Sequence, residues 1–156
     1  MVGPVELEMS IGIRAPAETV WPYLVDWENL GRWMTEARGL TVTSAYREGV
    51  GVTAHATISI AGITTNDPVR VTRWEPPSVL EIEHLGWVSG SGLMQCVPEW
   101  SGTRLLWKES LNPPLWVLGA VGLRVFRPIM RRVFEHDLDL LKKLVESESN
   151  ANGGVH

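Results

Sequence analysis

The chain has 156 residues, of which 44% are hydrophobic and 21% charged, and its formal net charge is -4. This is the composition of a soluble globular protein, and the length fits one domain, which we expect over residues 1–148. The negative charge, with no basic block before the C-terminal third, argues against nucleic acid as a partner, because phosphate binding needs a clustered positive face.

Cysteine content and the N-terminus bear on the compartment. Cys96 is the only cysteine, which excludes an internal disulfide and fits a reducing environment. Glu6 and Glu8 lie where a signal peptide would need a positive start and an apolar run. The longest uncharged apolar stretch, Pro113 to Leu123, is shorter than the roughly 18 residues typical of a membrane span. We therefore expect a cytoplasmic protein.

The first third of the chain predicts one strand and two short helices. Residues 5–13 alternate between apolar and other side chains, as expected of a half-buried strand. After Pro16 the apolar positions recur at helical spacing, which predicts a short helix. A second short helix is expected from Glu28 to Met34.

Strands and turns are predicted from Leu40 to Ser110. Pro68 lacks a backbone donor and therefore indicates a sheet edge or a bulge near residues 66–68. The expected runs are 41–46, 52–60, a third that ends near 74, and a meander over 79–85, 93–97 and 103–110.

The last third carries an apolar stripe at helical spacing that is too wide for an ordinary surface helix. Such a helix needs an apolar cover along its length, and the preceding strands are the only candidate. We therefore predict a sheet curved around a long C-terminal helix, with room for a ligand between them. Because of Pro128, we expect a short helix from Leu115 to Val125, a bend, and a main helix from Arg127 to about Ser147. Residues 149–156 are expected to form a disordered tail.

The order of these segments resembles a known superfamily. Ala-Pro-Ala-Glu-Thr-Val-Trp follows the first strand, Asp-Trp-Glu-Asn-Leu-Gly-Arg-Trp comes next, and Gly-Thr-Arg-Leu-Leu-Trp-Lys-Glu lies in the meander. Over residues 5 to about 147 the chain is similar to the START-like, Bet v 1-like superfamily (SRPBCC), and most to its polyketide cyclase/dehydrase and lipid-transport group.

This resemblance implies an α+β helix-grip fold. In that fold an antiparallel sheet of six to seven strands curves around a long C-terminal helix, with two short helices after the first strand. The fold encloses a cavity for lipids, sterols, polyketides or other apolar ligands. Because the superfamily contains enzymes and carriers, the fold does not choose between them.

Strand phase places two polar side chains on the predicted inner face. His84 shares a face with Ile82, and Glu109 shares one with Trp107. Two strand spacings, roughly 10 Å, would separate them, and the small residues 90–92 would leave space between. One interpretation is an acid/base pair. The other is a core histidine bonded to a carboxylate, or a Glu109 that reaches solvent at a strand end.

Asp137 falls near the centre of the apolar arc of the C-terminal helix. A buried carboxylate must be paired, cap a backbone end or contact a wet cavity. A structural role and a ligand-contacting role both remain open, and the sequence does not identify the partner.

Inward-facing apolar and aromatic side chains are the predicted cavity lining, although core packing is the alternative for each. Tryptophan suits such a lining because it offers a large apolar face and one N–H donor. With Asp137, the predicted ligand-binding residues are Trp33, Ile58, Val71, Ile82, Met94, Leu105, Trp107, Trp116, Phe126 and Met130.

The segment from Leu115 to Arg132 combines an apolar stretch with four arginines, Arg124, Arg127, Arg131 and Arg132. Transient docking to an anionic membrane is one interpretation. A cavity lid with a solvated basic face is the other.

The chain has no glycine-rich phosphate loop, no Gly-x-Ser-x-Gly elbow and no zinc-type spacing, so we expect no metal and no cofactor. We predict a carrier or sensor that binds an apolar small molecule such as a lipid, an isoprenoid or a polyketide-like compound. The alternative is a polyketide cyclase/aromatase or dehydratase that uses His84 and Glu109 as acid and base. A third class is an interaction module that presents residues 115–132. The ligand and the oligomeric state stay open.

Overall fold

The computed structural model describes residues 3–60 and 62–153, and within this range all side chains except those of residues 115–121 and 123. Most of the strands follow one another directly in the chain, without helices between them. In chain order the elements are β1 (Val5–Ile13), α1 (Ala17–Leu24), the 3-10 helix η1 (Trp27–Arg32), β2 (Ala37–Val42), β3 (Thr53–Ile60), β4 (Ile63–Glu75), β5 (Val79–His84), β6 (Ser89–Glu99), β7 (Gly102–Asn112) and α2 (Leu115–Gly153).

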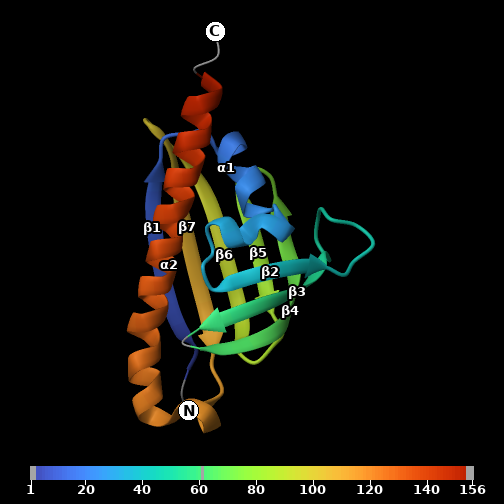
Figure 1. Ribbon diagram of the computed structural model, residues 1–156, viewed down its shortest axis with the longest axis vertical. Helices are drawn as coiled ribbons and strands as arrows, with labels where there is room; N and C mark the ends of the chain where they lie inside the picture. Colours follow the sequence, from blue (N-terminus) through green and yellow to red (C-terminus); the bar gives the residue numbers. More distant parts are fainter. Residues whose placement is uncertain (1–2, 61, 154–156) are drawn as a thin grey trace.

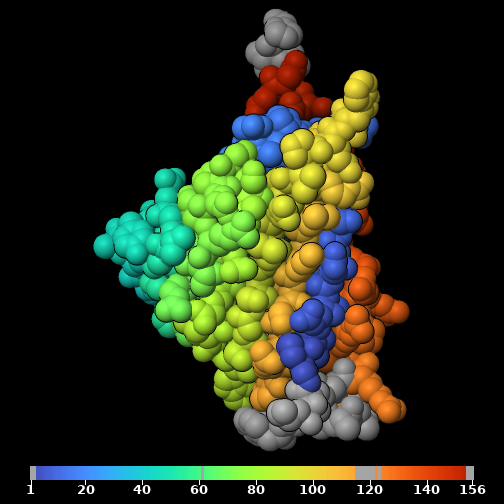
Figure 2. Space-filling model, turned by 180° about the vertical axis from the view of Figure 1, so that it is seen from behind, coloured from blue at the N-terminus to red at the C-terminus, as the bar shows by residue number. Residues whose placement is uncertain are grey.

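The strands form a seven-stranded antiparallel sheet in the order β1-β7-β6-β5-β4-β3-β2. The sheet curves so that β2 and β3 cross in front of the longer strands, and α2 lies along its inner face (Figure 1). From behind, the strands form the surface of the molecule (Figure 2). The predicted helix-grip fold is confirmed.

One stripe of α2 holds the sheet and the helix together. It consists of Met130, Phe134, Leu138, Leu141 and Val145, all buried at helical spacing. Burying one such side chain contributes about 1.5–3 kcal/mol, so the stripe supplies much of the free energy that holds α2 against the sheet. The alternation of β1 supplies its counterpart, because Leu7 and Met9 are buried while Glu6 and Glu8 are exposed.

The C-terminal helix differs from the prediction in two ways. It is a single element from Leu115 to Gly153, not two helices that meet at Pro128. Proline has no N–H to donate to the carbonyl four residues earlier in the helix. Because Pro128 is exposed, water can donate to that carbonyl instead, and the helix continues. Residues 149–153, predicted to be disordered, are helical, and residues 154–156 lie outside the described residues. Glu148 accepts hydrogen bonds from Tyr23 and Arg32, which tie the end of α2 to the first helices.

Two details of the sheet also differ. The strand predicted at 41–46 is β2, which ends at Val42, because the Thr43 and Ser44 N–H groups both bond to Thr53 O and start a turn. Pro68 does not mark a sheet edge: it lies in an interior strand, pairs with His55 of β3, and its carbonyl accepts a hydrogen bond from Leu85 N just after β5. The irregularity between β4 and β5 is at residue 72 instead.

No helix within residues 3–60 and 62–153 has the length and apolarity needed to cross a membrane.

Candidate functional site

His84 and Glu109 meet inside the curved sheet. Their strands, β5 and β7, lie on either side of β6, yet His84 Nε2 is 3.1 Å from Glu109 Oε2. The separation of the strands predicts a gap between the two groups, but the Glu109 side chain extends over Gly92, its pairing partner in β6. A methyl group at position 92 would overlap the Glu109 carboxylate. Glycine at this position therefore makes the contact possible.

Glu109 is held from a second side. Trp107 Nε1 donates a hydrogen bond to Glu109 Oε1 at 2.7 Å, and the Trp107 ring packs against Phe134 with centroids 4.6 Å apart. Glu109 is buried, whereas 28% of the His84 side chain is exposed. Burial alone would lower the pKa of His84, but the hydrogen bond and charge of Glu109 outweigh it, and the pKa is raised. The imidazolium form is therefore favoured.

Asp137 has the partner that the sequence did not identify. It is fully buried, and its Oδ1 accepts hydrogen bonds from Thr35 N at 3.0 Å and Thr35 Oγ1 at 2.8 Å. Thr35 lies in the connection between η1 and β2, so the carboxylate joins the helix to the start of the outer strands. The structural role is thereby observed.

Glu36 is the second carboxyl of this cluster and was absent from the predicted site. Its side chain is 7% exposed, and neither Glu36 Oε2 nor Asp137 Oδ2 has a hydrogen-bond donor among the described groups. Burial raises the pKa of Glu36, and the hydrogen bond and charge of Asp137 raise it further. A proton on Glu36 that is donated to Asp137 satisfies both oxygens. Glu36 lies in an irregular connection without periodicity, so the sequence carried no signal for it.

A cleft of about 290 Å³ opens between β3 and α2 beside this pair. Its walls are largely apolar, and Glu36 is the lining residue with an ionisable side chain. The lining residues are Thr35, Glu36, Ser59, Ile60, Ile129 and Val133. This cleft lies between the sheet and the C-terminal helix, so its apolar walls are sheltered on two sides.

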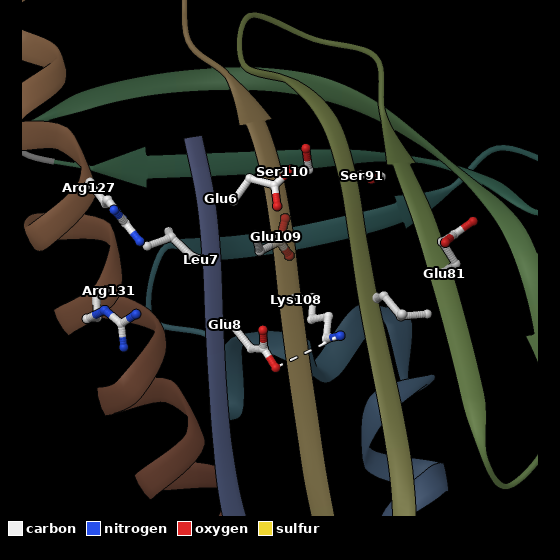
Figure 3. A pocket seen from close by; sticks show the side chains of 11 residues that line it. Glu6, Leu7, Glu8, Glu81, Ser91, Lys108, Glu109, Ser110, Arg127 and Arg131 are labelled. Atoms are coloured by element: carbon white, nitrogen blue, oxygen red, sulfur yellow. Dashed lines mark ion pairs between the residues drawn. The ribbon is translucent and has the colours of Figure 1, made fainter. Parts of the chain in front are cut away.

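A second hollow, of about 370 Å³, has a different character. Arg127 and Arg131 reach from α2 toward β1, while Glu8 pairs with Lys108 (Figure 3). Most of its lining is charged or polar and lies on outward-facing strand positions. We consider it a solvated surface depression, since it lacks the apolar walls that ligand pockets usually have.

The predicted ligand-binding residues fall into three groups. Those fully buried in the core are Trp33, Val71, Met94, Leu105, Trp107 and Met130. Those partly buried and packed against it are Ile58, Ile82 and Phe126. The Trp116 side chain lies outside the described residues. Of the whole set, Asp137 is in contact with a residue that lines the cleft, through its hydrogen bonds with Thr35.

Exposed apolar side chains occur in or near the segments that line the cleft. Ile63 is 60% exposed, Val125 49% and Ile129 43%. Three of the four arginines of this part of α2 are exposed as well, and the fourth, Arg131, is partly buried and 3.4 Å from Glu135.

A family model described as polyketide cyclase/dehydrase and lipid transport matches residues 4–146. No curated protein gives a match. Solved structures share the fold at low identity. A Thermus thermophilus protein has a TM-score of 0.80 at 21% identity, over 92% of this chain and 99% of that chain. The Zhui aromatase/cyclase from a Streptomyces species has 0.80 at 19%, over 96% and 98%. A START superfamily protein from Mycobacterium smegmatis has 0.77 at 17%, over 91% and 97%.

Proposed function

The chain belongs to the polyketide cyclase/dehydrase and lipid transport family, and on this premise we propose that it binds an apolar small molecule in the cleft between β3 and α2. The family match confirms the resemblance inferred from the order of the segments. The proposed role is that of a carrier or sensor of a lipid, an isoprenoid or a polyketide-like compound.

The cleft itself carries this proposal. Ile60, Ile129 and Val133 form apolar walls, and the Ile129 side chain is 43% exposed without a ligand to cover it. Covering such surface contributes about 25 cal/mol per Å². The buried carboxyl of Glu36 in the wall supplies a polar contact that would fix the orientation of the ligand.

Native mass spectrometry and solvent extraction of the purified protein test the proposal. We expect a co-purified or added apolar ligand to bind to the natural chain. Val133→Trp fills the cleft and should weaken binding at least tenfold. Asp139→Trp, at an exposed position of the same helix that does not line the cleft, is the control and should bind normally. Binding that is unchanged in Val133→Trp, with an unaltered unfolding temperature, would exclude the cleft as the site.

A second candidate function is acid/base catalysis, which the contact between His84 and Glu109 favours. A protonated His84 would protonate a leaving hydroxyl or a ketone oxygen of a bound polyketone, and Glu109 would stabilise the imidazolium. His84→Gln and Glu109→Gln should then abolish turnover of a linear polyketone while its binding persists. Undiminished turnover by His84→Gln would remove the cyclase/dehydratase proposal.

Contact with an anionic membrane through residues 115–132 also remains a proposal. The exposed apolar residues Val125 and Ile129, together with Arg124 and Arg132, support it. The double variant Arg124→Glu/Arg132→Glu should no longer co-sediment with vesicles rich in phosphatidylserine. Equal sedimentation of the natural and variant chains, or sedimentation of neither, would contradict it.

A further inference from the structure

Two carboxyl groups lie at the inner wall of the cleft between β3 and α2, one on the wall and one behind it. Glu36 lines the cleft with 7% of its surface exposed, and Asp137 of α2 lies behind it with 0% exposed. Glu36 Oε2 and Asp137 Oδ2 are both buried and have no donor among the described residues. Their depth and position make the pair the chemically distinctive part of an otherwise apolar cleft.

The pair holds one proton and one negative charge. Two ionised carboxylates at this depth would repel each other without screening by water, so one of the two takes up a proton. Glu36 is the member that keeps a proton, because burial and the neighbouring Asp137 raise its pKa, while Thr35 donates two hydrogen bonds to Asp137 Oδ1. The proton then lies on Glu36 Oε2 and points to Asp137 Oδ2, and both unpartnered atoms are satisfied.

No positive side chain balances this charge. Within the described part of the chain, no lysine, arginine or histidine forms an ion pair with Glu36 or Asp137. Glu109 also acts on the pair, because its charge disfavours ionisation of Glu36. The inner wall of the cleft therefore presents a negative potential and a hydrogen-bond acceptor.

We propose that the cleft accepts apolar ligands that end in a hydrogen-bond donor, a hydroxyl or an amine, and rejects ligands that end in a carboxylate. This inference rests on the proposed ligand-binding function. With its proton committed to Asp137, Glu36 offers its other oxygen, Oε1, as an acceptor. A hydroxyl or ammonium group donates to it, whereas a carboxylate would place acceptor against acceptor and charge against like charge. Free fatty acid anions are thereby excluded as ligands.

Three ligands with the same apolar body, octanol, octylamine and octanoate, test the inference by calorimetric titration at neutral pH. Octanol and octylamine should bind to the natural chain at least tenfold more tightly than octanoate. The double variant Glu36→Gln/Asp137→Asn keeps the shape of the pair but removes its charge, and should bring octanoate to within about threefold of octanol. Glu36→Gln alone is the control, because its amide can donate to Asp137 in place of the shared proton and leaves the Asp137 carboxyl group in place, so it should keep the discrimination.

The natural chain also provides a test without substitution. Below about pH 4 octanoate becomes octanoic acid, a neutral donor, and should then bind as tightly as octanol. Equal affinities of octanol and octanoate at neutral pH, or a double variant that folds and still rejects octanoate, would overturn the inference and leave the proposed function standing. Failure of all three ligands to bind would instead overturn the proposed function.

Discussion

His84 Nε2 and Glu109 Oε2 are 3.1 Å apart although a whole strand, β6, separates their backbones. The contact depends on Gly92, which pairs with Glu109 in β6 and has no side chain to occupy the space of the carboxylate. Trp107 fixes the other carboxylate oxygen, so Glu109 is aimed at the histidine from a buried position. Ionisation of His84 is consequently coupled to the packing of three strands.

Gly92→Ala should break this arrangement. The new methyl group displaces the Glu109 carboxylate and leaves it, or the Trp107 N–H, without a partner, which costs about 1–3 kcal/mol of the free energy of unfolding. Urea denaturation measures the loss. Gly39→Ala is the matched control, because its added methyl group meets open space in β2, and its stability should change little. Equal stabilities of the two variants would refute the assigned role of Gly92.

The raised pKa of His84 predicts a pH dependence of stability. A histidine whose folded pKa lies above its unfolded value stabilises the protein fully below about pH 6.5, and this contribution is lost as the pH rises through the folded pKa. The stability difference between the natural chain and His84→Gln should therefore shrink from about pH 6 upward. Urea denaturation over this range measures it. A difference that grows with pH would show that the imidazolium is not the favoured form.

Glu36 predicts a stability loss in the same pH direction, with an earlier onset. A carboxyl whose folded pKa is raised stabilises the protein below its ordinary pKa of 4.5, and the contribution is lost as the pH rises above that value. Glu36→Gln cannot ionise, so it should gain stability relative to the natural chain between about pH 4.5 and pH 8. Glu48→Gln, in an exposed loop, should run parallel to the natural chain. A parallel profile for Glu36→Gln as well would mean that Glu36 is already ionised.

The stripe of α2 is expected to carry much of the global stability. Leu141 is 0% exposed, so Leu141→Ala should cost about 2–5 kcal/mol through the lost burial and the cavity left behind. Leu85→Ala, at a position 47% exposed, should cost far less. Thermal or urea unfolding of the two variants compares them. Similar losses would indicate that α2 contributes little to the core.

Much of the fold could be predicted because it depends on repeated patterns. The apolar spacing of α2, from Met130 to Val145, requires a helix with a large cover, and the alternation of β1 requires a half-buried strand. Strand phase also placed His84 and Glu109 on the inner face. It did not give their contact, because that depends on how far the two side chains extend and on a glycine of a third strand.

The candidate site could be predicted only in part. Asp137 was recognisable, since a carboxylate in an apolar stripe is an anomaly in its own segment. Its partners Thr35 and Glu36 were not, because they lie more than a hundred positions earlier in an irregular connection. The helical end of α2 was missed for the same reason, as it is held by Tyr23 and Arg32 through Glu148.

The sequence by itself determined the architecture, since the periods of its apolar residues decide which faces must be buried and hence how a sheet and a helix cover each other. Only the tertiary structure decided where the cleft opens and what it presents to a ligand. Burial raises the pKa of Glu36, and the proximity of Asp137 provides an acceptor for the proton that Glu36 keeps. Both depend on the distance and the solvent exposure of residues that are remote in the chain, and no local pattern encodes these quantities.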